Sequence, residues 1–227
     1  MSPPVTEIAY ITLKPGTDIS GSSDAAKAWK EGLSIISKQA GYQRSRYGLT
    51  MESPELLMWF IDWNSVSSHK AFEASSDYTT FGSLLSTLMT TAHFHHIAFS
   101  PFPPSILTTA PVTEFVTFLD TTDDFQATEL ISIPRRPSFP SNVSKFMSAV
   151  GIPDGCYGGV WGESIETDIG KHEDGSLKGR VVVLAVGWES KDAHLRFTET
   201  EKFNENIGLL GEGLGGVEMF HVPFTAA

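Results

Sequence analysis

The sequence predicts an α+β fold made of two βαββαβ repeats whose sheets face each other. Residues 56–99 align with residues 181–224 at a constant offset of 125 and without a gap, which indicates an internal repeat. Both halves also show the same order of strand, helix, strand, strand, helix and strand. In addition, each half contains one strand, LLMWFIDW or VVVLAVGW, that is apolar on both faces. Helices can cover only one of those faces, so the sheet of the other half is expected to cover the second.

The repeat is thin in identity but constant in the order of its features. A second block, at an offset of 114, matches Gly41 with Gly155 and Tyr47 with Trp161. The segment TEIAYITL at 6–13 is similar to TEFVTFLD at 113–120. The gap-free block contains eight identical pairs, which are Trp63/Trp188, Ser65/Ser190, His69/His194, Phe72/Phe197, Leu84/Leu209, Leu85/Leu210, His96/His221 and Phe99/Phe224.

In the first half, alternating polarity predicts a strand at 5–13, which Pro15-Gly16 ends. Apolar residues at helical spacing predict a helix at 24–39, and Gly41 stops it. The remaining pattern predicts a hairpin of strands at 42–51 and 55–63, a long helix at 65–89 and a last strand at 92–99. A proline-rich linker, 101–111, joins domain 1–100 to domain 112–227. The second domain repeats the plan with two polar insertions, 121–137 and 166–179, expected to be loops.

Composition places the chain among ordinary globular proteins, with 41% hydrophobic and 19% charged residues. No apolar run approaches the ~20 residues that a membrane-spanning helix needs. The start, MSPPVTEIAY, lacks the pattern of a secretory signal, and the single cysteine, Cys156, fits a reducing compartment. We therefore expect a soluble, cytoplasmic protein.

The charge balance narrows the choice of partner. The net charge is −11 and the chain has only 16 Lys and Arg, whereas nucleic acids and anionic membranes are bound through clusters of basic side chains. Both are therefore excluded as expected partners. The 15 Phe, 5 Trp and 6 Met favour a large apolar pocket, so a hydrophobic small-molecule substrate is expected. A homodimer stays open.

Several features recur once per half. They are the Trp that ends a strand and the His that starts the next helix, the aromatic residues after them, the glycine before the second strand and a His in the last strand. In these features the chain resembles the dimeric α+β barrel proteins, and among them the antibiotic biosynthesis monooxygenase-like (ABM-like) group in the tandem form seen in fungal proteins. The residues are Trp63, His69, Phe72, Tyr78, Gly41 and His96, and Trp188, His194, Phe197, Phe203, Gly155 and His221.

The resemblance covers nearly the whole chain. It implies two ferredoxin-like βαββαβ repeats that form an intramolecular, pseudo-dimeric α+β barrel. It also implies oxygenation without a cofactor, in which a base deprotonates a phenol or enol and the resulting carbanion reacts with O2. Related barrels catalyse cyclisation, dehydration, isomerisation or decarboxylation with similar equipment.

Trp63 and His69 allow two interpretations. As scaffold, the Trp packs over the start of the second helix, and the His fixes the turn between strand and helix. As chemistry, His69 is a general base, because imidazole suits that role without any shift of its pKa. The scaffold interpretation is favoured because both halves keep the pair although they have otherwise diverged.

Features found in one half alone are stronger functional candidates, because one of two similar units is free to specialise. In AHFHHIAF at 92–99, His93 and His95 lie on one strand face and His96 on the other, and the second half keeps only the match of His96. A His-x-His metal site lacks further ligands here, so no metal is expected. The expected catalytic residues are His95, His69 and Tyr47, and the expected substrate-binding residues are Trp63, Trp59, His96, Phe72, Tyr157 and Trp161.

Three functions are compatible with the sequence. The first is an enzyme of specialised metabolism that acts on a hydrophobic aromatic or polyketide-like molecule. Its chemistry is cofactor-independent and monooxygenase-like, or alternatively that of a cyclase, isomerase or dehydratase. The second function is a non-catalytic ligand-binding or stress-response barrel. The third is haem binding, which the resemblance allows and which needs an axial His in an open pocket, with His69 and His95 as candidates.

Overall fold

The computed structural model describes residues 3–122, 125, 141–166 and 179–227. Most of the two insertions expected to be loops therefore lies outside the described residues. The chain forms two compact units, and each is described by itself. Unit 1 comprises Met1–Ala98 and Val222–Ala227, and unit 2 comprises Phe99–His221. Within the described ranges, every helix is too short or too polar to span a bilayer.

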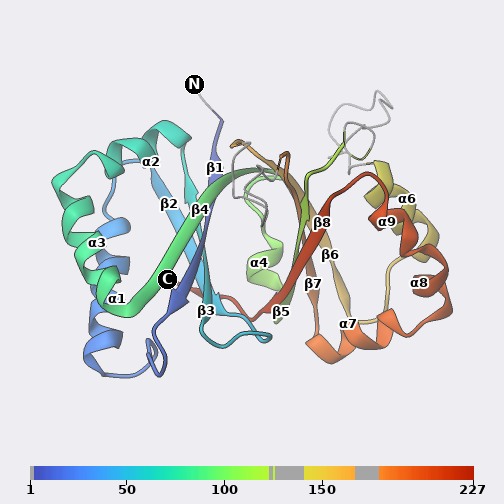
Figure 1. Ribbon diagram of the computed structural model, residues 1–227, viewed down its shortest axis with the longest axis horizontal. Coiled ribbons are helices and arrows are strands. Elements are labelled where there is room, and N and C mark those ends of the chain that lie inside the picture. Colours follow the sequence, from blue (N-terminus) through green and yellow to red (C-terminus); the bar gives the residue numbers. More distant parts are fainter. Residues whose placement is uncertain (1–2, 123–124, 126–140, 167–178) are drawn as a thin grey trace. The chain divides into compact units, whose positions relative to one another are not determined.

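Unit 1 follows the expected βαββαβ order, with its second helix divided in two. Its strands have the order β4-β1-β3-β2-β9 and are antiparallel. Helices α1, α2 and α3 lie on one face of this sheet (Figure 1). The last residues of the chain belong to unit 1 because β9 pairs with β2. The elements are β1 (Val5–Leu13), α1 (Asp24–Ile36), β2 (Tyr42–Leu49), β3 (Leu56–Trp63), α2 (Val66–Glu73), α3 (Ser76–Leu88), β4 (Met89–Ser100) and β9 (Thr225–Ala226).

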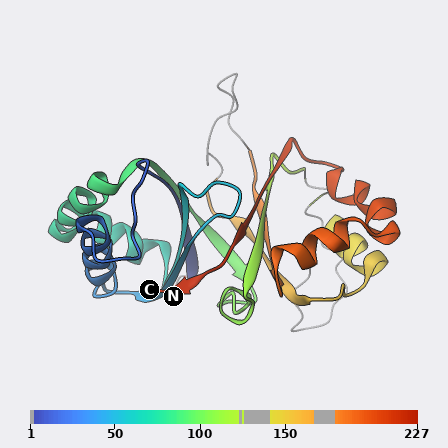
Figure 2. The ribbon, with the colours of Figure 1, turned by 90° about the horizontal axis from the view of Figure 1, so that it is seen from below.

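Unit 2 repeats the plan. Its strands have the order β8-β5-β7-β6, and β7 pairs antiparallel with both β5 and β6. Helices α6 to α9 gather on one face of this sheet, as Figure 2 shows from a second side (yellow to red). The elements are α4 (Ile106–Thr109), β5 (Val112–Leu119), α6 (Ser141–Val150), β6 (Cys156–Ser164), β7 (Val182–Trp188), α7 (Lys191–Thr198), α8 (Glu201–Asn206), α9 (Gly208–Gly211) and β8 (Gly216–Val222).

The prediction of one long helix at 65–89 is wrong, because this segment forms two helices, α2 and α3. Ser65 caps α2 and Ser75 caps α3, and each side chain accepts a hydrogen bond from the backbone N–H three residues later. Unit 2 breaks at the matching position, where Thr200 caps α8 in the same way. A hydroxyl that satisfies an otherwise free N–H at a helix start makes such a break favourable.

The strands that are apolar on both faces are also buried on both. Every residue of β7 is buried, and so is every residue of β3 after Leu56. On the side of β7 away from α6 to α9, Ile106 of α4 packs closely over Gly187. The segment expected to be a linker, 101–111, therefore contains a short helix that belongs to unit 2. The pairing of the two sheets into a barrel stays a prediction.

The glycine that precedes β2 is required by its backbone and by its neighbour. Gly41 has φ +89°, in the region that favours glycine, and Gly155 takes the same place in unit 2 with φ +78°. An added Cβ at Gly41 would lie 2.5 Å from Cβ of Ser68, an atom fixed to helix α2. Gly41→Ala is therefore expected to lower the free energy of unfolding by about 2–4 kcal/mol, as measured by urea denaturation.

Gly82 offers a matched control for this prediction. It lies within α3, and an added Cβ there meets no atom within 4 Å. Because alanine is the better helix former, Gly82→Ala is expected to be neutral or slightly stabilising. If the Gly41 and Gly82 variants lost equal stability, the steric argument for Gly41 would be wrong.

Candidate functional site

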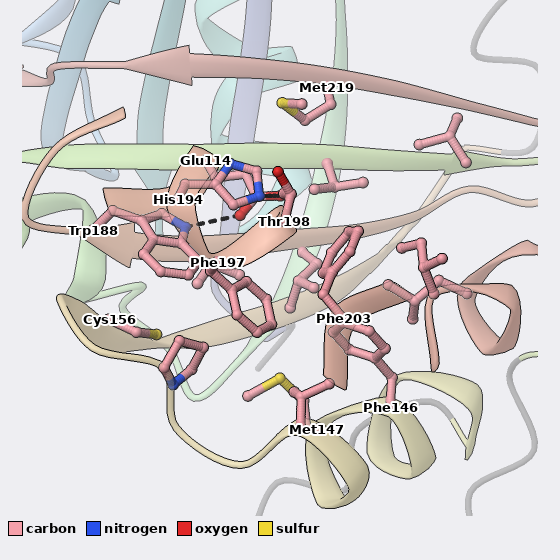
Figure 3. Close-up of a pocket in the computed structure, with 18 of the residues that line it drawn as sticks. Glu114, Phe146, Met147, Cys156, Trp188, His194, Phe197, Thr198, Phe203 and Met219 are labelled. Carbon is pink, nitrogen blue, oxygen red and sulfur yellow. Dashed lines mark hydrogen bonds and ion pairs between the residues drawn. The ribbon is translucent and has the colours of Figure 1, made fainter. Parts of the chain in front are cut away.

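Unit 2 contains a cavity of about 330 Å³ between its sheet and helices α6 to α9. This volume lies at the lower end of the range of about 300–1,000 Å³ that small-molecule sites occupy. The walls are mainly apolar, with Phe146 and Met147 from α6, Phe197 from α7, Phe203 from α8 and Leu184 from β7. Most of these side chains are seen around the cavity in Figure 3. The cavity suits a small hydrophobic ligand.

The mouth of the cavity is marked by lining residues that are partly exposed. Ile207, just after α8, is 38% exposed, and Val217 and Met219 on β8 are 50% and 38% exposed. A ligand is therefore expected to enter between β8 and the end of α8.

Glu114, Trp188 and His194 line one end of the cavity, and His221 contacts His194 from outside the lining. We name these four side chains the unit 2 cluster. Trp188 Nε1 donates to Glu114 Oε2 at 2.8 Å. His194 Nε2 lies 3.5 Å from Glu114 Oε1, and His194 Nδ1 lies 2.7 Å from His221 Nε2. Figure 3 shows Glu114, Trp188 and His194 together, opposite Phe146 and Met147. The cavity therefore combines apolar walls with one polar end.

Local structure explains why these side chains meet. Alternation along β5 places Glu114 on the face of Val116 and Phe118, which also line the cavity. Ser190 caps α7 directly after β7, so His194 in the first turns of that helix lies back over Trp188. The two rings stack with their centroids 5.0 Å apart.

Glu114 is the ionisable group best suited to chemistry in this cavity. Burial raises its pKa from 4.5 to about 7, although the hydrogen bond from Trp188 acts in the opposite direction. Its side chain keeps 13% of its exposure, and it lines the cavity. A carboxyl group with a pKa near neutrality can both accept and return a proton under ordinary conditions.

The protonation state of Glu114 is linked to the tautomers of the two histidines. An ionised Glu114 favours a proton on Nε2 of His194, so that His194 Nδ1 accepts a hydrogen bond from the Nε2–H of His221. A protonated Glu114 favours the opposite arrangement of both hydrogen positions. When Glu114 takes up a proton from the cavity, the hydrogen bonds of His194 and His221 can therefore rearrange to match.

Unit 1 contains the same four residue types in the same arrangement, which we name the unit 1 cluster: Glu7, Trp63, His69 and His96. Trp63 Nε1 donates to Glu7 Oε2 at 2.8 Å. His69 Nε2 lies 3.4 Å from Glu7 Oε2, and His69 Nδ1 lies 2.9 Å from His96 Nε2. The Trp and His that the sequence singles out thus belong to a duplicated cluster of four residues.

In unit 1, aromatic rings fill the space between sheet and helices. Trp29 of α1 packs edge to face on Trp59 of β3, with centroids 4.8 Å apart, and Trp59 lies 6.0 Å from Phe81 of α3. Phe72 connects Phe81 to Trp63, with centroid distances of 5.4 and 6.1 Å. A continuous aromatic core therefore runs from α1 to the unit 1 cluster.

The unit 1 cluster also has the composition of a metal site. One ligand atom from each of Glu7, His69 and His96 lies within 4.8 Å of the others. At 2.9 Å, the facing nitrogens of His69 and His96 share one proton, which a metal ion would have to displace before both nitrogens could bind it. The contacts are those of a hydrogen-bonded cluster.

The histidines are poorly placed to serve as an axial haem ligand. Such a ligand needs a ring nitrogen that faces the iron. His194, which lines the cavity, has its two ring nitrogens directed at His221 and Glu114. His69 is held in the same way and its side chain is 3% exposed, while His95 is 2% exposed and does not line the cavity.

None of the nine residues expected from the sequence to form the site lines this cavity. Seven of them lie in unit 1, where Trp63, His69 and His96 come together in the unit 1 cluster and Trp59 and Phe72 belong to the aromatic core. The two in unit 2 are on β6. There, Tyr157 is 52% exposed and Trp161 packs against the apolar core. The roles expected of the nine residues stay predictions.

The other two expected catalytic residues lie apart from the unit 1 cluster. His95 stacks on Tyr10 with centroids 5.6 Å apart, on the opposite face of β4 from His96. Tyr47 packs edge to face on Trp29 at 5.0 Å, within the aromatic core. The structure therefore does not bring His95, His69 and Tyr47 into one site.

Sequence reasoning missed the two glutamates. Glu7 and Glu114 each follow a threonine in the first strand of their repeat, TEIAYITL and TEFVTFLD. Both stand on the strand face that turns towards the helices and is otherwise apolar. A carboxyl group on a buried face at matching places in two diverged repeats is the signal that could have identified them.

No family model matches the chain, and no curated protein matches its sequence. Solved structures match its fold over nearly the whole length. An anthrone oxidase-like protein shares 14% identity at a TM-score of 0.63, over 99% of this chain and 93% of its own. A proposed monooxygenase from Fusobacterium nucleatum subsp. nucleatum shares 9% identity at 0.59, over 99% and 94%.

A proposed chlorite dismutase shares 11% identity at a TM-score of 0.59, over 98% of this chain and 94% of its own. At these identities the comparisons show a common fold and leave the chemistry open. The chain has a mixed α and β fold, with antiparallel sheets, that also occurs in proteins described as monooxygenases.

Proposed function

We propose that the protein is an enzyme that binds a hydrophobic, hydroxyl-bearing aromatic molecule in the unit 2 cavity and uses Glu114 as its acid and base. One observation carries this proposal: an apolar cavity holds a carboxyl group whose pKa burial raises to about 7. Acid and base catalysis is most effective when the pKa of the group lies near the working pH.

The surroundings of Glu114 define the ligand it can serve. Among the residues that the structure describes, neither Lys nor Arg lines the cavity, and the chain carries a net charge of −11, so these residues offer an anionic ligand no compensating charge. A neutral phenol or enol can donate its O–H to the ionised carboxylate and place its rings among Phe146, Phe197 and Phe203. The cavity thus favours a neutral, weakly acidic ring system.

The proposed reaction begins with transfer of a proton from the substrate to Glu114. The carboxylate becomes a carboxylic acid, and the electron pair of the broken bond stays on the substrate as a phenolate or carbanion. The Trp188 N–H holds Oε2, and His194 faces Oε1, so the carboxyl group keeps one orientation towards the cavity.

O2 is the proposed second substrate, in keeping with the fold shared with proteins described as monooxygenases and with the ABM-like resemblance. For a ring CH2 activated by a neighbouring carbonyl or phenol, the carbon becomes C=O and gains one oxygen atom of O2. The other oxygen atom, with the two hydrogens removed, leaves as water. The same acid and base would serve a cyclase, isomerase or dehydratase, which is the alternative within this proposal.

Binding and oxygen uptake test the proposal. By calorimetry, 2-naphthol is expected to bind more tightly than naphthalene, and naphthalene-2-sulfonate is expected not to bind, because the first donates a hydrogen bond and the last brings an uncompensated charge. With anthrone, the enzyme is expected to consume one O2 per anthraquinone formed, faster than the uncatalysed reaction. Absence of naphthol binding would overturn the proposal, and binding without any O2 uptake across a panel of anthrones would leave only the alternative.

A further inference from the structure

We propose that unit 1 is a closed second copy of this site, with its acid and base residues complete and its ligand cavity filled by the side chains of Trp59, Trp29 and Phe81. The ligand class of that copy rests on the function proposed for unit 2. The inference itself concerns why a ligand can reach the cluster of unit 2 but not the similar cluster of unit 1.

The two copies contain the same four residue types and the same pairs of contacts, although His69 Nε2 lies nearest to Oε2 of Glu7 and His194 Nε2 to Oε1 of Glu114. In each, the Trp Nε1 donates to a glutamate Oε2 at 2.8 Å, and the His Nδ1 faces the second His Nε2 at 2.9 Å in unit 1 and 2.7 Å in unit 2. In each, the His ring stacks on the Trp ring, with centroids 5.2 and 5.0 Å apart. Loss of a catalytic group therefore does not distinguish unit 1 from unit 2.

What differs is the bulk on the strand that faces the helices. Trp59 on β3 and Leu184 on β7 stand at matching positions of the repeat, and Leu184 lines the cavity. Phe81, which is 8% exposed and packs on Trp59, matches Asn206. In unit 2, Leu184 fills less of this space than Trp59 does in unit 1, and Asn206 is not among the residues that line the cavity, so neither position places a ring there. Trp29 packs on Trp59 from α1 and completes the filling.

The aromatic filling also leaves polar groups unsatisfied. Trp29 and Trp59 are each 1% exposed, and their indole N–H groups have no hydrogen-bond partner among the described residues. A buried donor without a partner destabilises a fold. Removing Trp59 therefore costs less than its packing alone suggests, which makes an opened unit 1 accessible to experiment.

The central test is the stoichiometry of 2-naphthol binding to the full chain. The wild type is expected to bind one molecule per chain, at unit 2. Trp59→Leu/Phe81→Ala is expected to bind two, and the additional site is expected to bind more weakly when Glu7→Gln is added, because a neutral amide oxygen is a weaker acceptor than a carboxylate. A double variant that unfolds cooperatively near the wild-type temperature yet still binds one molecule would overturn the inference.

The reciprocal variant keeps the inference testable if the opened unit 1 fails to fold. Leu184→Trp places in unit 2 the residue that closes unit 1, so it is expected to abolish 2-naphthol binding to the otherwise wild-type chain. Retained binding by a folded Leu184→Trp protein would overturn the inference. Leu57→Ala, which removes buried volume farther along β3, controls for general loosening of unit 1 and is expected to leave one site.

The outcomes also separate this inference from the proposed function. If the wild type binds no 2-naphthol, the function proposed for unit 2 fails. If the wild type binds one molecule and the folded double variant gains none, only the inference about unit 1 fails.

Discussion

Replacing Glu114 with Gln is expected to lower the turnover number about 10²- to 10⁴-fold, the contribution usual for a group that transfers a proton in the rate-determining step. The amide oxygen of Gln can still accept the Trp188 N–H, so the position of the side chain and the fold are expected to persist. The amide cannot take a proton from the substrate. Turnover measured by O2 uptake, together with 2-naphthol affinity, separates lost chemistry from lost binding.

Glu7→Gln is the matched control, because Glu7 holds the same hydrogen bond from Trp63 in unit 1. Glu7 is buried at 5% exposure and faces no described cavity, so this variant is expected to keep wild-type turnover. If the Glu7 variant lost activity as strongly as the Glu114 variant, the assignment of the chemistry to unit 2 alone would be wrong. If neither lost activity, the acid and base assignment would be wrong.

The second large effect is on stability. Between pH 4.5 and about 7, the free energy of unfolding is expected to fall by up to about 3 kcal/mol through Glu114 alone. In this range the folded protein holds a proton on Glu114 that the unfolded chain has released, so folding takes up a proton. The stability that this proton confers is complete below pH 4.5 and is lost as the pH rises through about 7.

Urea denaturation of the wild type and of Glu114→Gln at several pH values isolates this contribution. The difference between the two curves is expected to change steadily between pH 4.5 and 7 and to be constant above about pH 8. Above about pH 8 the wild type buries an ionised Glu114, whereas the Gln variant buries no charge. The free energy of unfolding of the Gln variant, relative to that of the wild type, is therefore expected to be higher above pH 8 than at low pH. Curves that stay parallel over the whole range would mean that the pKa of Glu114 is not raised by folding.

Much of the fold follows from local patterns. The strand at 5–13 and the hairpin of β2 and β3 lie where alternation and turn residues place them, because a strand's faces are set by a period of two. The break of the second helix at Ser75 was missed, since its cap sits within an apolar periodicity that continues on both sides. The helix α4 in the proline-rich segment was missed because only four residues form it.

The candidate site followed from the sequence less well. The pairing of Trp63 with His69 and of Trp188 with His194 is visible as a repeat, and so are the matched histidines His96 and His221. The glutamate that joins each set lies more than 50 positions earlier in unit 1 and more than 70 in unit 2, on another strand. Sequence spacing carries no information about such a contact, and the expectation that one-sided features mark the site pointed to His95 instead.

The sequence by itself determined that this protein has two similar halves, the strand faces that are apolar, and the Trp and His that each half keeps. Only the tertiary structure decided that a buried glutamate completes each set and that the open cavity lies in unit 2. The physical reason is that a cavity is the volume left after side chains from several elements have packed. Leu184 and Trp59 are both ordinary core residues in sequence, and only their neighbours from the helices decide whether space remains beside the carboxyl group.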